Sequence, residues 1–324
     1  MPAVPAASVA ERFEAARSGD RRALARLLSH VERGDVVARQ LGALAFPLAG
    51  AGYTVGLTGA PGAGKSTLTS SVVGELRARG DRVSVLAIDP SSPFTGGALL
   101  GDRTRMNDHA LDEGVFIRSM ATRGHLGGLA LATPEAIRLL DAVGFPWVLV
   151  ETVGVGQVEV EVAGAADTTV VVVNPGWGDS VQANKAGLME IADVFVVNKA
   201  DRPGAEQTVH DLESMLDLTR GGLPWRPPVV SAVGLTGDGA AELCDAVRAH
   251  REHLVATGEL ARRRARRLRD ELAAVVAERL RAAAEDRMGA GARERVEDAL
   301  LAGDLDPWAA ADELLGLPAS DHPQ

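Results

Sequence analysis

The sequence predicts an α/β fold, a doubly wound and mostly parallel sheet with helical extensions at the N-terminal and C-terminal ends. Short runs of valine, isoleucine and leucine alternate with helix-like segments through the middle of the chain. Many of these runs are continuous, which indicates strands that are buried on both faces, as in a parallel sheet covered by helices. After Gly258 the apolar residues recur at helical spacing instead, which predicts a helical C-terminal part.

The expected strands follow from the continuous apolar runs, and the expected helices from the segments between them. The strands are Tyr53–Thr58, Val83–Ile88, Val115–Ser119, Trp147–Glu151, Thr168–Val173, Val194–Val197 and Val229–Ser231. The helices are Ser66–Arg79, Pro134–Val143, Gln182–Ile191, Ala205–Leu218 and Gly239–Val255.

Three parts of the chain are expected from these patterns: an N-terminal helical arm over 1–50, a nucleotide-binding domain over 51–257 and a C-terminal helical arm over 258–324. The helix signals of the two arms are capping residues and stop residues. These signals are Ser8 with Glu11, Asp20 with Gly34, Asp35 before a helix reaching Leu48, and Asp306-Pro307 with Gly316.

Composition excludes several classes of protein. The 34 Lys and Arg residues against 44 Asp and Glu residues give a net charge of −10, which disfavours nucleic acid as a partner. The single cysteine, Cys244, excludes a disulfide within the chain and a cysteine-based metal cluster, and it fits a cytoplasmic protein. The uncharged stretch over 40–64 is interrupted by prolines and glycines, so no membrane segment is expected.

A glycine-rich loop follows the first expected strand and precedes a helix. It reads Gly59-Ala60-Pro61-Gly62-Ala63-Gly64-Lys65-Ser66, followed by Thr67, and fits the pattern G-x-x-x-x-G-K-[ST]. Backbone N–H groups of such a loop cradle phosphates, and the helix N-terminus adds partial positive charge. Lys65 is expected to reach the β- and γ-phosphates and the Ser66 hydroxyl to ligate Mg²⁺. The sequence therefore predicts a P-loop nucleoside triphosphatase.

A second motif, Asn198-Lys199-Ala200-Asp201, follows the strand expected at 194–197. A buried carboxylate at Asp201 would accept hydrogen bonds from the N1–H and N2-amino groups of guanine, which adenine cannot donate. Asn198 is expected to tie this loop to the phosphate loop, and the Lys199 stem to cover the base. Ser231 and Ala232 end another strand, where a backbone N–H could meet guanine O6.

Three carboxylates, Asp89, Asp102 and Glu151, are expected at or just after the ends of strands. Strand ends of a parallel sheet converge on the crevice that holds a nucleotide, and Mg²⁺ with its waters prefers oxygen ligands. The Gly154 amide is a candidate sensor of the γ-phosphate. The basic side chains in the neighbouring loops are candidates for stabilising charge in the transition state; they are Arg103, Arg105, Arg123 and Lys185.

Together these motifs resemble the methylmalonyl-CoA mutase-associated GTPases, the MeaB/ArgK-type proteins of the SIMIBI class. The resemblance runs from about residue 20 to residue 317. The matching stretches are GAPGAGKST (59–67), DPSSPFTGGALLGDRTRM (89–106), IRSMATRGHLGGL (117–129), ETVGVGQ (151–157), PGWGDSVQANKAGLMEIADVFVVNKAD (175–201) and DPWAAADELL (306–315).

The resemblance implies a Mg²⁺-dependent GTPase that converts GTP to GDP and phosphate, and that forms a homodimer through its C-terminal arm. It implies that hydrolysis gates the loading and protection of an adenosylcobalamin-dependent acyl-CoA mutase, with a cobalamin adenosyltransferase as a further candidate partner. The family's third switch falls on 175–187, including Asp179 and Lys185. Val158 stands where family members commonly have serine, so the identity of the client mutase stays open.

Two other functions are compatible with a nucleotide-binding core. One is a GTPase metallochaperone for metalloenzyme maturation, and the other is a nucleotide-sensing scaffold without significant hydrolysis. The first would need Cys and His metal motifs, and the pair His250 and His253 is not expected to bind a metal. The arginine run over 262–269 is interpreted as a solvated or interface face, because acidic residues flank it.

Overall fold

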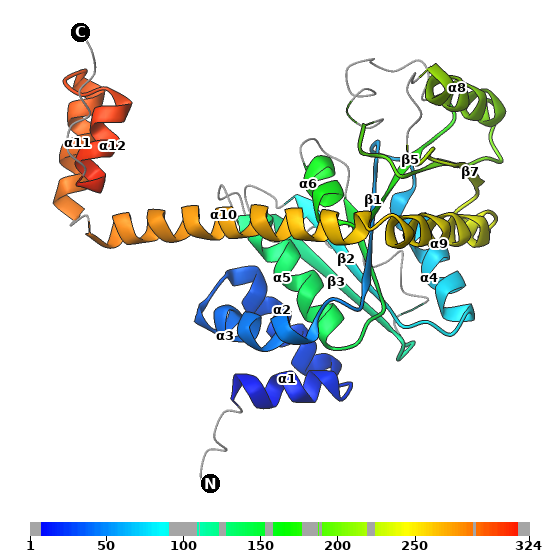
Figure 1. Cartoon of the computed structure of the whole chain (residues 1–324), viewed down its shortest axis with the longest axis horizontal. Coiled ribbons are helices and arrows are strands. Elements are labelled where there is room, and N and C mark those ends of the chain that lie inside the picture. Colours follow the sequence, from blue (N-terminus) through cyan, green and yellow to red (C-terminus); the bar gives the residue numbers. More distant parts are fainter. Residues whose placement is uncertain are drawn as a thin grey trace. The chain divides into compact units, whose positions relative to one another are not determined.

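The computed structural model describes residues 8–90, 109, 111–122, 128–152, 158–176, 187, 190–218, 224–287 and 290–316. The chain forms two compact units, Met1–Leu268 and Arg269–Gln324. The first unit holds the sheet and the N-terminal helices (Figure 1).

One sheet of seven parallel strands forms the centre of the first unit, and all seven strands expected from the sequence are confirmed. Several of them run one to three residues further at the carboxyl end than the apolar pattern indicates. The strands are β1 (Tyr53–Gly59), β2 (Val83–Pro90), β3 (Val115–Thr122), β4 (Trp147–Thr152), β5 (Thr168–Val173), β6 (Val194–Asn198) and β7 (Val229–Ala232).

The strand order is β3-β2-β4-β1-β5-β6-β7, so β1 lies in the middle with β4 on one side and β5 on the other. Neighbouring strands on the two sides of β1 are reached by crossovers in opposite directions. Ligands of open α/β sheets bind at such a reversal, outside the carboxyl ends of the strands. The topology therefore places the loop after β1 where a nucleotide site is expected.

Helices cover both faces of this sheet and extend the chain at both ends (Figure 1). The first group is α1 (Val9–Arg17), α2 (Arg21–Arg33), α3 (Val36–Ala45), the 3₁₀ turn η1 (Phe46–Leu48), α4 (Lys65–Ala78) and α5 (Gly128–Ala142). The second group is α6 (Val158–Ala165), α8 (Ala205–Leu218), α9 (Ala240–Ala256), α10 (Glu259–Arg287), α11 (Ala290–Ala302) and α12 (Pro307–Leu315). The sequence did not predict α6, and most of the helix expected at 182–191 lies outside the described residues.

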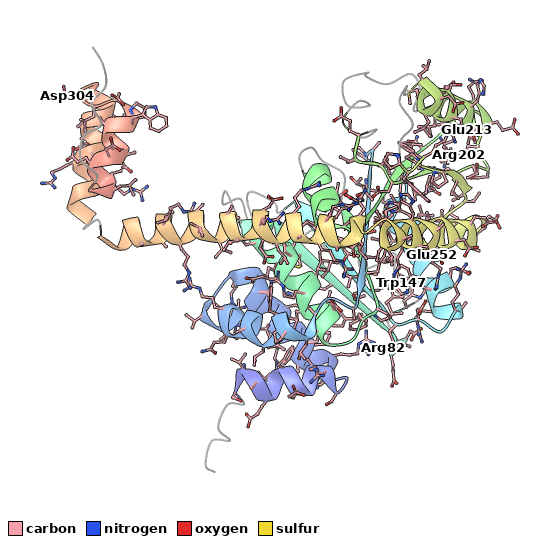
Figure 2. The ribbon with its side chains drawn as sticks, viewed as in Figure 1. Arg82, Trp147, Arg202, Glu213, Glu252 and Asp304 are labelled. Atoms are coloured by element: carbon pink, nitrogen blue, oxygen red, sulfur yellow. The ribbon has the colours of Figure 1, made fainter. Side chains whose placement is uncertain are left out.

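Alternate residues of each strand enter different hydrophobic cores, which is why the strands read as continuous apolar runs. On β2, Val83 and Val85 pack with α4 and α9, whereas Leu86 and Ile88 pack with α2 and α5. A third cluster joins β5 and β6 to α8. At the start of β4, Trp147 meets Tyr53 edge-on with ring centroids 5.7 Å apart, and Figure 2 labels this tryptophan.

The N-terminal helices begin where the sequence places their caps. Ser8 and Glu11 form a capping box, in which each side chain bonds to the other's backbone N–H. The Asp20 carboxylate accepts from the N–H groups of Arg22 and Ala23, and Gly34 ends α2 in the left-handed conformation. Buried leucines of α2 then pack against α5, so this arm belongs to the core of the first unit.

The second unit contains α11, α12 and most of α10. Asp306 caps α12 through the N–H groups of Trp308 and Ala309, and Gly316 ends it, as the sequence predicts. On α10, Leu272, Val276 and Leu280 recur at every fourth position and remain 63, 47 and 64% exposed. Among the described helices, none has both the length and the apolar composition that a bilayer crossing requires.

The interpretation of the arginine run as a solvated or interface face is wrong for three of its members. Arg263 pairs with Asp193, and Arg264 and Arg267 both pair with Asp167. The two carboxylates are buried and precede β6 and β5, where an unpaired charge would be costly to desolvate.

Candidate nucleotide-binding site

The glycine-rich loop joins the end of β1 to the first residue of α4, at the centre of the sheet. Gly59 and Gly64 have φ values of +132° and +86°, in the region that glycine adopts without strain. A Cβ atom on Gly64 would lie 2.5 Å from Nδ2 of Asn198. Glycine at this position therefore allows the loop both to turn into the helix and to approach β6 closely.

Lys65 is buried, with 6% of its surface exposed, and its ammonium lies inside the loop. Its Nζ donates to the carbonyl oxygens of Gly59 at 2.6 Å and of Ala60 at 3.1 Å. These carbonyl groups keep the positive charge at the start of the loop. Ser66 and Thr67 follow in the first turn of α4, so their hydroxyl groups lie on the helix that the loop opens.

Asn198 links three loops at the carboxyl edge of the sheet. Its Nδ2 donates to the carbonyl oxygens of Ala63 at 2.8 Å and Gly64 at 3.3 Å, which is the tie to the phosphate loop expected from the sequence. Its Oδ1 accepts from the N–H of Gly234 at 3.0 Å, beyond β7. Because Asn198 is only 2% exposed, these bonds form away from water and fix the relative positions of the loops.

Lys199 and Asp201 follow on the turn after β6. Lys199 has a φ of +59°, and its Nζ donates to the carbonyl oxygen of Gly62 at 2.6 Å, so its stem spans to the phosphate loop. Asp201 is exposed, which corrects the expectation of a buried carboxylate. The side chain lies on the turn after β6, and among the described residues no element buries it.

The segment after β7 lies next to this turn. The N–H of Ala200 donates to the carbonyl oxygen of Ala232 at 3.0 Å, which joins the two expected base-contacting segments. Ala232 is buried and Ser231 is exposed. The structure thus brings Asn198, Lys199 and the 231–232 segment together around the phosphate loop.

Glu151 lies at the carboxyl end of β4, beside β1, and is completely buried. Its Oε2 accepts from the hydroxyl of Thr69 on α4 at a donor–acceptor distance of 2.6 Å. A buried carboxylate is therefore held against the helix that begins at Lys65.

The remaining expected residues are described in part or not at all. Asp89 is the seventh residue of β2, in register with Ala121, and its side chain lies outside the described residues. Several other expected residues lie wholly outside them: Asp102, Gly154, Arg103, Arg105, Arg123, Asp179 and Lys185.

Three residues of this region were missed by the sequence analysis. The Ser71 hydroxyl donates to the carbonyl oxygen of Gly234 at 2.7 Å, and Thr69 holds Glu151. Thr69 and Ser71 both lie on α4, three and five positions after Ser66, the last residue of the glycine-rich motif. Gly234 gave no sequence signal, because nothing local shows that its backbone approaches α4.

Residues 24–288 match the family model described as "Methylmalonyl Co-A mutase-associated GTPase MeaB". A Pyrococcus abyssi protein that is named as a GTPase is 50% identical over 308 residues, covering 94% of this chain and 95% of that protein. The GTPase ArgK of Escherichia coli is 40% identical over 262 residues, covering 78% and 79% of the two chains.

Among solved structures, a crystal structure described as a LAO/AO transport system kinase superposes with a TM-score of 0.72 at 28% identity. It covers 96% of this chain and 97% of that chain. This similarity extends over the sheet and both helical extensions, so it supports the same architecture in both proteins. Within the described residues of this chain, no group of three or more His, Cys, Asp or Glu side chains is arranged to hold a metal ion.

Proposed function

The chain belongs to the MeaB family of methylmalonyl-CoA mutase-associated GTPases, and from this premise we propose that its GTP hydrolysis serves an adenosylcobalamin-dependent acyl-CoA mutase. The activity itself, hydrolysis of GTP, comes with the family. The proposed role is to gate the loading of the cofactor and to protect the loaded enzyme. The observation that carries the nucleotide part is the phosphate loop with Lys65 buried inside it and Asn198 bonded across it.

The loop supplies what a triphosphate requires. Its backbone N–H groups and the N-terminus of α4 provide partial positive charge, and the Lys65 ammonium provides a full charge. We propose that Lys65 contacts the β- and γ-phosphates, with the loop from Gly59 to Thr67 around them. Because Lys65 is already held by two carbonyl groups, little side-chain entropy would be lost on binding.

Selection of guanine is assigned to Asp201, with Lys199 and Ala232 on either side of the base. The Asp201 carboxylate would accept from the N1–H and N2-amino groups, and the base would cover it from water. Adenine offers no donor at these positions, so it would leave a desolvated charge without a partner. The exposed position of Asp201, close to the loops that Asn198 joins, supports this assignment.

The oxygen donors at this edge fit Mg²⁺. Ser66 on α4 and Glu151 on β4 offer a hydroxyl and a buried carboxylate, the hard ligands that this ion takes directly or through water. We assign both to the metal together with Asp89 and Asp102, and the Gly154 amide to the γ-phosphate. The bound ion would neutralise charge that develops on the phosphates.

The proposed partner is a mutase of the methylmalonyl-CoA type or a relative acting on another acyl-CoA, and a cobalamin adenosyltransferase is a further candidate. The name of the matching family supports this partner class. We also propose a homodimer through the C-terminal arm, supported by the exposed apolar positions Leu272, Val276 and Leu280 on α10.

Calorimetry with GTP, GDP and ATP tests the nucleotide site. We expect heat with both guanine nucleotides and none with ATP at the same concentration. Lys65→Ala should weaken GDP binding roughly 10- to 100-fold, the effect of losing one charge-assisted contact. Asp201→Asn should shift preference toward XTP, because xanthine carries a carbonyl where guanine carries an amine. Equal heat with ATP, or an Asp201→Asn variant that still prefers GTP, contradicts the assignment.

Phosphate release tests the partner. Purified adenosylcobalamin-dependent acyl-CoA mutases are added one at a time to the protein with GTP. At least one is expected to change the rate of phosphate release, and Lys65→Ala should abolish the effect. Turnover that no mutase alters would contradict the gating role while leaving the GTPase activity intact.

A further inference from the structure

Thr69 is a completely buried residue on α4, one helical turn after Lys65, that no motif of the sequence includes. Its hydroxyl oxygen lies 2.6 Å from Oε2 of Glu151 and 2.9 Å from the carbonyl oxygen of Lys65. Glu151 is also completely buried. One threonine therefore contacts both the backbone of the phosphate-loop lysine and the carboxylate at the end of β4.

The hydroxyl has one proton, and the geometry indicates where it goes. In a helix the carbonyl of Lys65 already accepts the backbone N–H of Thr69, four residues later. A separation of 2.6 Å is typical of a hydroxyl that donates to an ionised carboxylate, and such bonds are about twice as strong as neutral ones. The proton is therefore donated to Glu151.

We propose that Thr69 is a positioning residue for the metal site: it fixes the Glu151 carboxylate in the orientation that the Mg²⁺ of a bound guanine nucleotide requires. This inference rests on the proposed function. Ser66 and Thr69 are three residues apart and share a face of α4. The same helix thus sets both the serine hydroxyl and, through Thr69, the carboxylate that is assigned to the ion.

A structural role alone would have a different consequence. If Thr69 only filled the core between α4 and β4, its loss would weaken nucleotide binding equally with and without Mg²⁺, or would lower stability alone. If it orients Glu151, its loss acts on the metal-dependent part of binding. The dependence of nucleotide release on the Mg²⁺ concentration separates the two roles.

The test uses the full chain and measures the release of fluorescent mant-GDP over a range of Mg²⁺ concentrations and in EDTA. Thr69→Val keeps the shape of the side chain and removes the donor. We expect the Mg²⁺ concentration at half-maximal slowing of release to rise about tenfold, as for one hydrogen bond to a charged group. The release rate in EDTA should stay within about twofold of wild type, and Thr69→Ser should restore the Mg²⁺ response.

Thr133→Val is the matched control. Thr133 is also a buried helical threonine, on α5, and its hydroxyl has no hydrogen-bond partner among the described residues. Its loss should leave the Mg²⁺ response unchanged. Thr69→Ala gives a second variant without the donor and without a branched side chain, in case the valine disturbs folding.

Glu151→Gln completes a double-mutant cycle. If Thr69 acts through Glu151, Thr69→Val should add no further shift in the Mg²⁺ response of the Glu151→Gln variant. A wild-type Mg²⁺ response in Thr69→Val, an equal loss in EDTA, or full additivity with Glu151→Gln would overturn the proposal. A wild-type protein that binds no guanine nucleotide would instead overturn the proposed function, so the two failures are distinguishable.

Discussion

At the carboxyl edge of the sheet, β6 ends in an asparagine whose side chain bonds to loop backbones, whereas at the amino edge β5 and β6 begin beside carboxylates paired with arginines. Asn198 represents the first kind, with bonds to Ala63, Gly64 and Gly234. Asp167 represents the second kind: it is 1% exposed and pairs with Arg264 and Arg267 from α10. Both of these side chains are buried and polar, but their hydrogen-bonding groups have different partners.

The amino edge is closed by charges that compensate each other within the protein. Arg264 also donates to the carbonyl oxygens of Gly50 at 2.7 Å and Gly52 at 2.6 Å, just before β1. Asp193 accepts from the N–H of Thr169 at 2.9 Å and from Arg263 through both carboxylate oxygens at 3.0 Å. This edge therefore attaches the first turns of α10 to three strands.

The carboxyl edge carries charged side chains on and beside the phosphate loop. Lys65 and Lys199 donate to carbonyl oxygens of the phosphate loop, and Asp201 remains exposed. These carbonyl oxygens accept hydrogen bonds from the ammonium groups without adding a negative charge. The difference teaches that buried ion pairs hold the strands and α10 together at the amino edge, whereas under the proposed function the polar groups at the carboxyl edge hold the loops around the nucleotide.

The largest expected effect is loss of the carboxylate at the amino edge. Burial raises the pKa of Asp167, but hydrogen bonds and charge from Arg264 and Arg267 outweigh burial and lower that pKa below its ordinary value. Asp167→Asn removes the carboxylate that both guanidinium groups contact. We expect the free energy of unfolding in urea to fall by about 3 kcal/mol, as for broken buried ion pairs.

Asp217→Asn is the control for that measurement. Asp217 pairs with Arg226 at 2.7 Å, and both side chains are more than half exposed. An exposed pair of this kind contributes little, so the free energy of unfolding should stay close to wild type. The division between the two edges is wrong if the two variants lose the same free energy of unfolding. It is also wrong if Asp167→Asn lowers the free energy of GDP binding to the folded protein by more than it lowers the free energy of unfolding.

The second expected effect is a pH dependence that originates at the same edge. His250 on α9 is completely buried, with Nδ1 2.8 Å from the Thr168 hydroxyl and Nε2 3.3 Å from Oδ1 of Asp193. Burial lowers the pKa of His250 to about 4; Arg263 and His253 act in the same direction, and Asp193 and Asp167 oppose them. The imidazole is therefore neutral in the folded protein at neutral pH.

The direction of this pH dependence follows from proton uptake by the unfolded chain. Between an unfolded pKa of about 6.5 and the folded value, the unfolded chain binds a proton that the folded protein does not. The contribution of His250 to stability is complete above this window, falls as the pH is lowered through it, and levels off below about pH 4. We expect His250→Asn to make the free energy of unfolding less dependent on pH in this window. Leu254→Ala, in the same helix, should lower stability equally at every pH, and an unchanged slope in His250→Asn would contradict the assignment.

The two edges also differ in how far the sequence could predict them. The glycine-rich loop, Asn198 and the strand ends are local patterns, and the structure places them at one edge of a parallel sheet. The pairs at the amino edge join residues about 100 positions apart, such as Asp167 and Arg267. No local pattern distinguishes a buried arginine from a solvated one, so the charge run on α10 favoured the wrong interpretation.

Two further differences between the sequence-based predictions and the structure have physical causes. The helix α6 begins with Val158-Glu159-Val160-Glu161, an alternation of period two that is typical of a strand, yet α6 packs against β1 and β4, with Val162 buried. Tertiary packing outweighs local propensity there. The contact of Thr69 with Glu151 joins residues 82 positions apart. Glu151 was therefore expected at the site, whereas no local pattern indicated Thr69 or its bond to Glu151.

The smallest expected effect concerns a close backbone approach between the segment after β7 and α4, at the carboxyl edge. A Cβ atom on Gly234 would lie 3.1 Å from the backbone nitrogen and 3.2 Å from the Cα atom of Leu68, on α4. Because these atoms belong to a helix backbone, the segment after β7 would have to move by a few tenths of an ångström. That movement would disturb the bonds from Gly234 to Asn198 and Ser71. We expect Gly234→Ala to lower the free energy of unfolding by about 1 kcal/mol.

The control for this substitution is a glycine whose replacement by alanine should raise the free energy of unfolding instead of lowering it. Gly42 lies inside α3 with no atom within 4 Å of an added Cβ, so Gly42→Ala should raise the free energy of unfolding by about 0.5–1 kcal/mol. Gly234→Ala should also weaken GDP binding about threefold, by roughly half a kcal/mol, since Asn198 holds the phosphate loop through the same contacts. Gly42→Ala should leave GDP binding unchanged. If Gly234→Ala proves as stable as wild type and binds GDP equally well, the loops at this edge are not held by close backbone packing, and Asn198 alone must position them.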